Sequence, residues 1–341
     1  MRNSNITTTF NGLISLIQKL PIPFKTSVLK ELNPIRAIYI ERRAPRICIL
    51  GASTRSAVEL IFGLGTGELT EEQSRLGWTN FKNANSARIS IFDARGNNQE
   101  APMGLPLSEP APDLVLVFPD ESNFTDISIT SPLPNLPGVP VFKLSAGTIA
   151  LSPIHPPLSE INPPLPSHSA SSIQHNEWQA LLCASLPLEA QLEFARLLSA
   201  KRAQAYIAST LLKSFGAVSG AVGMQPIPVA DMPLLFSIQA TMVALIIHTS
   251  GRPASLKLAS EFLAALGVSA GAGFLFRETA RALLRFIPIW GNAVSGIIAG
   301  TGTYAIGRAA IAYFIDDSPL VETRRLFLSL MKTQKKPILN N

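Results

Sequence analysis

The chain has 341 residues, of which 47% are apolar and only 15% charged, and it carries a net charge of +6. This length supports two domains with separate cores, and so apolar a composition excludes a wholly disordered chain. Two cysteines exclude a disulfide framework and a four-cysteine zinc site, and four histidines without ligand-like spacing argue against metal catalysis.

The charge is unevenly divided along the chain. Residues 1–50 carry eight Lys or Arg against two acids, residues 51–170 six against twelve, and residues 171–341 fifteen against nine. A nucleic-acid-binding protein would show a clustered basic face, so no nucleic-acid partner is expected. Basic ends favour anionic membrane lipid or an acidic protein partner. No cleavable signal peptide is expected, because polar residues interrupt the first apolar stretch.

Residues 1–45 are expected to form an N-terminal helical arm. Apolar residues recur at helical spacing from Phe10 to Leu20, where two prolines break the pattern, and a second short helix is predicted from Thr26 to Leu32. Two interpretations stay open. The arm packs on the face of a domain, or it lies in a membrane interface.

Residues 46–150 carry the signals of an α/β domain with a mostly parallel sheet. A short apolar run from Arg46 ends at Gly51 and predicts a buried strand, and the stretch from Ser56 to Leu64 predicts a helix. Strands separated by turn or helix signals are typical of α/β units. The further strands are expected at 87–93, 113–118 and 139–144.

The composition then changes twice. Six of the twenty residues from 151 to 170 are proline, which predicts an extended Pro/Ser-rich linker over 151–175. Residues 176–333 are predicted to form a helical domain, punctuated by Gly and Pro. Its helices are expected at 177–185, 188–214, 229–250, 254–266, 270–286, 290–315 and 319–333, with Asp231 at the start of one of them.

The segment after the first predicted strand compares with a phosphate-binding loop. Such loops present backbone N–H groups and a helix N-terminus to the anion. The P-loop pattern needs Gly, four residues, Gly, Lys and then Ser or Thr, whereas this chain reads Gly51-Ala-Ser-Thr-Arg-Ser-Ala-Val. Ala57 offers no charge to the phosphates and Val58 offers no oxygen to Mg²⁺. Arg55 is the one cation within this stretch.

Two later segments compare with nucleotide-binding motifs. Asp93-Ala-Arg-Gly96 follows a predicted strand and resembles the D-x-x-G motif of GTPases, in which the Asp reaches Mg²⁺ and the Gly N–H contacts phosphate. Residues 143–146 stand where a guanine-reading N-K-x-D motif would follow a strand, but lack its Asn and Asp. Thr79 is a candidate switch threonine. The expected phosphate-site residues are Gly51, Arg55, Ser56, Asp93 and Gly96.

Longer stretches carry a family resemblance. Asn33-Pro34-Ile35-Arg36, followed by Glu41 to Arg46, resembles the segment that leads into bacterial G domains of the Era/TrmE-like kind. The second half is similar to the C-terminal helical domain of unknown function that those proteins often carry. The stretches that carry this similarity are Leu192-Glu-Phe-Ala-Arg, Gln225-Pro-Ile-Pro-Val-Ala-Asp-Met-Pro-Leu, Ile287-Pro-Ile-Trp-Gly-Asn and Gly300-Thr-Gly-Thr-Tyr-Ala-Ile-Gly-Arg-Ala.

The resemblance covers residues 33–150 and, more closely, 185–315. It implies a GTP-binding switch, and the departures at Ser56, Ala57, Val58 and 143–146 imply a degenerate G domain, a pseudo-GTPase. The α/β segment is also short at about 105 residues, because the Pro-rich stretch stands where the family has a last strand and helix.

The helical half has two readings. Residues 232–249 and 288–306 approach the roughly 20 apolar residues that cross a bilayer, and three small-x-x-x-small pairs permit close helix approach in lipid. Gln239 and the charges of the middle helices favour a soluble core instead. Arg277, Arg281 and Arg285 share one helical face, which is either solvated or binds lipid headgroups. The three pairs are Gly216/Gly220, Gly267/Gly271 and Gly296/Gly300.

The sequence therefore predicts an α/β P-loop-like fold, a degenerate G domain, followed by an all-α helical domain, membrane-embedded or soluble. The expected function is a non-catalytic scaffold or regulatory partner of an active paralogue, without cofactor or metal, at the cytoplasmic face of the inner membrane or in the cytoplasm. One alternative is a GTP- and Mg²⁺-binding switch that uses Arg55, and another is a soluble interaction module. No catalytic residues are expected, because no Gly-x-Ser-x-Gly is present and the linker histidines, His155, His168 and His175, are expected to be solvated loop residues.

Overall fold

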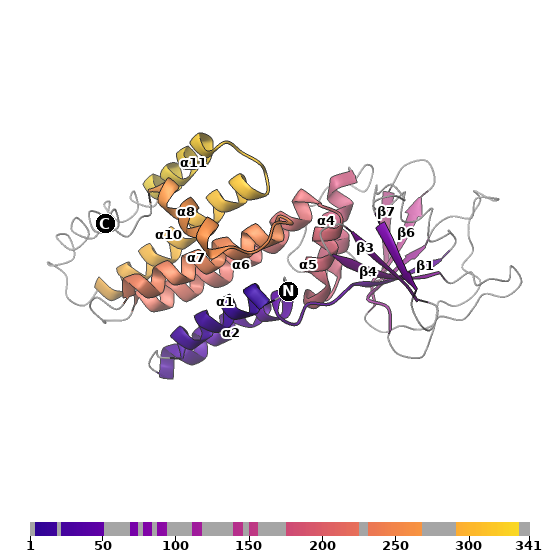
Figure 1. The fold of residues 1–341 in the computed structure, drawn as a ribbon, viewed down its shortest axis with the longest axis horizontal. Coiled ribbons are helices and arrows are strands. Elements are labelled where there is room, and N and C mark those ends of the chain that lie inside the picture. Colours follow the sequence, from indigo (N-terminus) through magenta and orange to yellow (C-terminus); the bar gives the residue numbers. More distant parts are fainter. Residues whose placement is uncertain are drawn as a thin grey trace, which may run out of the picture. The chain divides into compact units, whose positions relative to one another are not determined.

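The computed structural model describes residues 4–18, 22–50, 69–73, 78–83, 87–93, 111–117, 139–145, 150–155, 175–224, 231–267 and 291–333. The chain divides into two compact units (Figure 1). The α/β unit is residues 42–206, and the helical unit joins residues 1–41 to residues 207–341. The expected layout of an α/β part followed by an all-α part is confirmed, with the N-terminal arm added to the helical unit.

A mixed sheet, to which the described residues contribute seven strands, forms the centre of the α/β unit (Figure 1). Its strand order is β2-β3-β4-β1-β5-β6-β7. The four central strands, β4-β1-β5-β6, run parallel, while β2, β3 and β7 pair antiparallel at the edges. The bounds are β1 (Arg46–Leu50), β2 (Leu69–Gln73), β3 (Trp78–Asn83), β4 (Arg88–Asp93), β5 (Leu114–Val117), β6 (Val141–Ser145) and β7 (Ala150–His155).

The central strands are apolar on successive residues, as a parallel sheet covered on both faces requires. The side chains of β1 from Ile47 to Ile49 and those of β5 from Leu114 to Val117 are all buried. Trp78 of β3 and Phe92 of β4 stand in register and their ring centroids lie 5.5 Å apart. These two rings pack with Cys48, Val115, Val117 and Val141 in one core cluster.

The described residues of the α/β unit also form α4 (His175–Ser185), α5 (Leu188–Leu197) and the start of α6 (Lys201–Gly223). Every residue of α5 from Ala190 to Leu197 is buried, and this helix packs on β4. A helix buried on all sides must satisfy its own polar side chains. Gln191 does so by donating from Nε2 to the Leu186 carbonyl oxygen at 3.0 Å.

The structure corrects the expected limits of the α/β part. The sheet does not end at 150, because β7 occupies residues 150–155 inside the predicted linker of 151–175. Pro153 is tolerated there because β7 is the last strand in the sheet order. The side of its backbone that faces away from β6 needs no N–H donor for a neighbouring strand. Helices α4 and α5, expected in the helical domain of 176–333, belong to the sheet unit.

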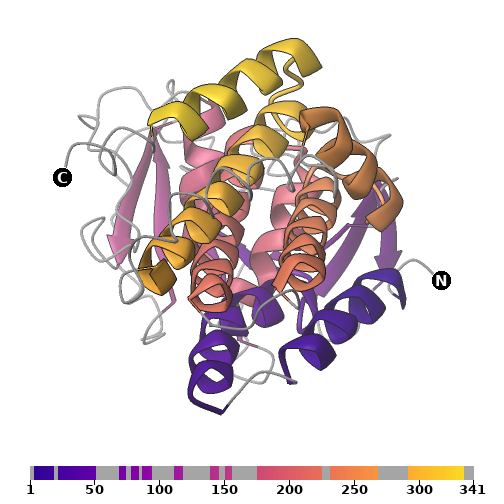
Figure 2. The same ribbon diagram turned by 90° about the vertical axis from the view of Figure 1, so that its left-hand side faces the viewer.

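The helical unit contains α1 (Ser4–Ile17), α2 (Ile22–Tyr39), the later part of α6 (Lys201–Gly223), α7 (Asp231–Thr249), α8 (Leu256–Leu266), α10 (Gly291–Phe314) and α11 (Leu320–Thr333). Helix α7 packs against α1, α8 and α10, and α10 packs against α11 (Figure 2). The apolar face of α1, made by Ile6, Phe10, Leu13 and Ile17, is buried. The arm therefore packs within this unit.

Two predicted helix boundaries are wrong. Helix α2 continues beyond Leu32, through Pro34, to Tyr39. The added turns are stabilised by burial of the Ile35, Ile38 and Tyr39 side chains. The helix expected over 188–214 is divided into α5 and α6 at Ser199, whose φ of 48° breaks the helix. The helix predicted at 270–286 lies outside the described residues.

Two of the predicted small-residue pairs face each other. Gly216 and Gly220 of α6 lie against Gly300 and Gly296 of α10, close enough that a Cβ placed on Gly300 would come within 2.9 Å of the Gly216 carbonyl oxygen. Gly267 instead ends α8 in the left-handed conformation, with φ of 87°, and Gly271 lies outside the described residues. The pairs therefore join two helices of one unit.

Helix α7, the most apolar of the described helices, has a hydrogen-bond partner for its Gln239 side chain within the same unit. Gln239 of α7 donates from Nε2 to the Thr303 hydroxyl of α10 at 3.2 Å, and the residues of α7 from Ala240 to Thr249 are buried. Among the helices that the structure describes, none combines the length and the apolarity needed to cross a bilayer.

Candidate functional site

The candidate functional site is the sheet edge formed by the carboxyl ends of the four parallel strands. These ends meet because β4, β1, β5 and β6 all run the same way. Asp93 ends β4 opposite Ile49, and Val117 ends β5 opposite Leu50. The last described residue of β1 is therefore flanked by the ends of both neighbouring strands.

The chain also changes direction across the sheet at β1. From β1 it builds β2, β3 and β4 on one side, and then β5, β6 and β7 on the other. In open α/β sheets, ligands bind outside the carboxyl ends of the strands at such a switch point. By this rule, the sheet edge directly after β1 is the candidate position for a ligand.

The structure describes one of the five predicted site residues, Asp93, which closes β4 at this edge. Its Cα is paired with that of Ile49, two positions before Gly51 in the sequence. The D-x-x-G segment and the predicted loop thus begin from adjacent strands. The other four residues, Gly51, Arg55, Ser56 and Gly96, lie outside the described residues, as do Ala57 and Val58.

Two further predicted positions lie within strands. Lys143 and Ser145 belong to β6, where Lys143 is opposite Val117 of β5 and Ser152 of β7. The segment compared with a guanine-reading motif, residues 143–146, was expected to follow a strand, but residues 143–145 are themselves the end of β6. Thr79, the candidate switch threonine, lies in β3 between Gln73 of β2 and Ile91 of β4, inside an antiparallel ladder.

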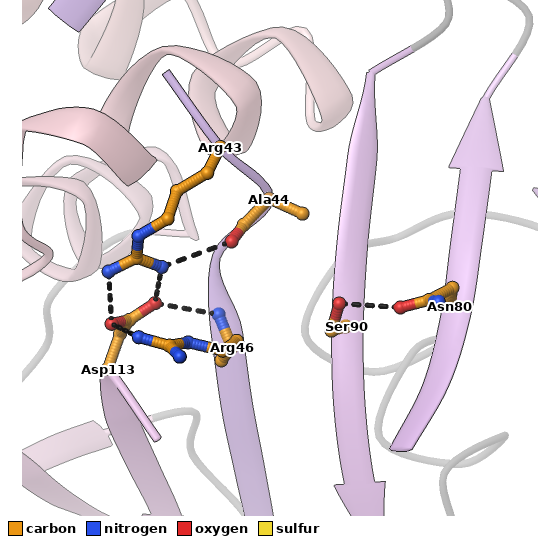
Figure 3. Close-up of polar contacts among 6 residues, drawn as sticks. All are labelled: Arg43, Ala44, Arg46, Asn80, Ser90 and Asp113. Atoms are coloured by element: carbon orange, nitrogen blue, oxygen red, sulfur yellow. Dashed lines mark hydrogen bonds and ion pairs between the residues drawn. The ribbon is translucent and has the colours of Figure 1, made fainter. Parts of the chain in front are cut away.

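A polar cluster occupies the opposite edge, where the parallel strands begin (Figure 3). The two terminal nitrogens of the Arg43 guanidinium donate to the two carboxylate oxygens of Asp113, with Nη2 2.7 Å from Oδ1. The Arg46 N–H donates to Oδ2 at 2.9 Å, and its Nη2 donates to Oδ1 at 3.2 Å. Asp113 therefore binds the segment before β1 to the start of β5.

The charges of this cluster stabilise one another. Burial raises the pKa of Asp113, whose side chain is 4% exposed, but hydrogen bonds from Arg43 and Arg46 outweigh burial and leave the pKa below its ordinary value. The hydrogen bond to Asp113 likewise raises the pKa of Arg43. The cluster is a charge-assisted, bidentate contact of the kind that fixes geometry most firmly.

A second acid extends the same cluster to α5. Glu193 accepts from the Arg88 N–H at 3.2 Å and pairs with Arg42, with 3.6 Å between Nη1 and Oε1. The Arg43 N–H donates to the Glu189 carbonyl oxygen at 2.9 Å. Residues 42–46 thus connect β4, β5 and α5 at the edge opposite the candidate site.

The sequence did not show that these charged residues are partners of one another. The run from Arg42 to Arg46 was noted only for its family resemblance, and Asp113 only as the start of a strand. The available signal was a basic run before one buried parallel strand and a lone acid before its neighbour. Because every charged group named here has a partner, we assign the cluster a structural role.

Neither cysteine chemistry nor a metal centre has support in the described part of the chain. Cys183 is buried, donates from Sγ to the Gln191 carbonyl oxygen at 3.6 Å, and has its pKa raised by burial, which is the opposite of a reactive thiolate. Within those residues, no group of three or more His, Cys, Asp or Glu is arranged to hold a metal ion.

A polar network in the helical unit links α2 to α7. Thr249 donates from Oγ1 to the Leu245 carbonyl oxygen at 2.9 Å, so the Tyr39 hydroxyl, 2.6 Å away, is the donor to Thr249. The Tyr39 ring also lies 6.5 Å from that of His248, whose Nδ1 is 3.3 Å from the Arg252 carbonyl oxygen. These groups satisfy one another, which fits a structural role.

No protein-family model matches the chain, and no curated protein is similar to it. Any functional interpretation therefore depends on the sheet topology, the position of Asp93 and the residues after β1.

Proposed function

We propose that the chain is a non-catalytic, GTPase-like protein, a pseudo-GTPase, in which a P-loop-like α/β unit is joined to a membrane-associated helical unit. It acts as a scaffold or as the regulatory partner of an active paralogue. The observation that carries the proposal is the position of Asp93, which ends β4 beside the last residues of β1, at the reversal of the strand order.

The residues after β1 support the non-catalytic part of the proposal. A P-loop holds the β- and γ-phosphates with a Lys ammonium and the magnesium ion with a Ser or Thr hydroxyl. At the matching positions this chain has Ala57 and Val58. The loop therefore lacks the ammonium and the hydroxyl that a P-loop uses to hold a triphosphate and its metal.

Ion pairs within the α/β unit hold its central strands together. Arg43 and Arg46 on Asp113, together with Arg42 on Glu193, join β1, β5 and α5 through internal contacts. These contacts lie at the amino edge of the sheet, opposite the candidate site, so they fit a scaffold and a nucleotide-binding switch equally well.

One observation favours a second candidate, a GTP-binding switch with an atypical loop. Asp93 is the last residue of β4, as expected for the Asp of a D-x-x-G motif, and the sequence has the cation Arg55 after β1. In this candidate, Arg55 and the backbone N–H groups after Gly51 bind the phosphates. The two candidates predict opposite results in a nucleotide titration.

The test is equilibrium binding of fluorescent GTP and ATP analogues to the full chain, with and without Mg²⁺. The pseudo-GTPase predicts no saturable site. A submicromolar site that is lost in Asp93→Ala and kept in Glu261→Gln, an exposed acid on α8, would establish the switch instead.

A further inference from the structure

Helix α11 has one face in the helical unit and one face outside it. Thr323 and Phe327 are buried, and α11 packs on α10. On the other side, Val321 is 63% exposed and Leu328 is 43% exposed. Val321 is the most exposed large apolar side chain that the structure describes, and Leu328 lies two helical turns later, so together they give this side of the helix an apolar surface.

Three cations share that face. Residues three, four, seven or eleven positions apart lie on the same side of a helix. Val321 therefore shares its side of α11 with Arg324, Arg325, Leu328 and Lys332. All three cations are exposed. We call these five residues the outer face of α11, in which two apolar side chains lie between basic ones.

This arrangement matches the chemistry of a bilayer surface. Apolar side chains enter the boundary between headgroups and acyl chains, while long basic side chains beside them extend to the lipid phosphates. The charge is also of the right sign, because residues 320–336 contain five Lys or Arg and one acid, Glu322. Anionic lipid attracts such clusters.

A nucleic acid would use the same cations differently. Binding to its backbone needs a basic surface, and single strands add aromatic platforms for base stacking. The outer face of α11 instead has Val321 and Leu328 at its centre and no aromatic residue. A lipid bilayer can contact both kinds of side chain, because its acyl chains accept the apolar residues and its headgroups bind the basic ones.

We propose that the outer face of α11 binds the surface of an anionic phospholipid bilayer, with the helix lying along the interface. This inference specifies the membrane contact of the proposed function and does not depend on whether the α/β unit binds nucleotide. It assigns membrane recognition to an interfacial helix, for which no membrane-crossing segment is required.

The test is co-sedimentation of the full chain with vesicles of pure phosphatidylcholine or of phosphatidylcholine with 30% phosphatidylglycerol. We expect binding to the anionic vesicles only, and weaker binding at 0.5 M salt, because salt screens the cations. Reversing two charges in R324E/R325E should weaken binding at least tenfold, since each basic residue near an anionic surface contributes about fivefold. V321S/L328S should weaken it without changing the salt dependence.

The matched control is K213E/K257E, which changes the net charge equally at exposed positions on α6 and α8 and should bind like the wild type. Circular dichroism verifies that each variant is folded. If the wild type binds and the α11 variants bind equally well, the outer face is the wrong surface although membrane association stands. If the wild type fails to bind, both are wrong. Equal binding to soluble polyglutamate would indicate an acidic protein partner and overturn the lipid proposal.

Discussion

Arg43 and Asp113 are 70 residues apart in the sequence and share two parallel hydrogen bonds at the amino edge of the sheet. The same carboxylate accepts from the backbone and side chain of Arg46, the first residue of β1. One acid thus fixes the direction from which the chain enters its central strand. The candidate site lies at the other end of that strand.

Removing the charge of Asp113 should destabilise the α/β unit. Asp113→Asn leaves Arg43 and Arg46 facing a neutral amide, and we expect the free energy of unfolding to fall by about 2–3 kcal/mol. The value lies below that of a fully buried pair because water screens the half-buried Arg43. Urea unfolding followed by circular dichroism measures it, with the exposed Glu261→Gln as the control. Equal midpoints for the two variants would contradict the structural role.

The same contact predicts acid sensitivity. The pKa of Asp113 is lower in the folded protein than its ordinary value of 3.8. Its contribution to stability is therefore fully present above pH 3.8 and is lost as the pH falls through the lower, folded-state pKa. Unfolding free energies measured from pH 5 downward should drop less steeply in Asp113→Asn than in the wild type. A parallel drop in both proteins would show that other groups cause the acid sensitivity.

The strands that sequence reasoning located are those rich in apolar residues. Strands β1, β4, β5 and β6 each contain at least three apolar residues within four to six positions, and this density predicts a strand from the sequence alone. Strand β2, Leu-Thr-Glu-Glu-Gln, carries no such pattern and is a strand because β3 pairs with it. Strand β7 was not predicted because it contains Pro153, and the last turns of α2 were not predicted because they follow Pro34. Tertiary packing overrides local propensity at both positions.

The candidate site was predictable to a similar extent. Asp93 was placed correctly at the end of a strand, because a local motif after an apolar run is visible in sequence. The pairing of Asp113 with Arg43 could not be predicted, because the two residues are 70 positions apart. Only the parallel pairing of β1 with β5 brings them together. Sheet topology is therefore the information that the residues alone did not supply.

The contact between α6 and α10 predicts opposite effects for two glycines of one helix. Gly300→Ala should lower the free energy of unfolding by about 1–3 kcal/mol, because its Cβ would lie 2.9 Å from the Gly216 carbonyl oxygen. Gly302→Ala meets nothing within 4 Å and should raise stability by up to about 1 kcal/mol, as expected for Ala in a helix. Thermal unfolding of both variants measures this difference. Stabilisation by both substitutions would exclude a close approach of the two helices.

The buried hydroxyl of Tyr39 should contribute measurably to the helical unit. Tyr39→Phe removes the donor 2.6 Å from the Thr249 hydroxyl and should cost about 1 kcal/mol, since Thr249 keeps its bond to the Leu245 carbonyl oxygen. Tyr304→Phe is the matched control, because that ring is 43% exposed. Urea unfolding of the two variants should separate them. If both match the wild type, the Tyr39 hydroxyl has no net effect on stability.

Restoring the missing groups tests the relationship to P-loop proteins directly. The triple substitution S56G/A57K/V58T turns the residues after β1 into Gly, four residues, Gly, Lys and Thr, which supplies the ammonium and hydroxyl that a triphosphate and its magnesium ion need. We expect this variant to gain saturable, Mg²⁺-dependent binding of a fluorescent GTP or ATP analogue. Adding Asp93→Ala should abolish the gain, whereas adding Glu261→Gln should leave it. A folded triple variant that binds neither nucleotide would show that the loop after β1 is not a degenerate phosphate loop, although the order of the strands around it would stand.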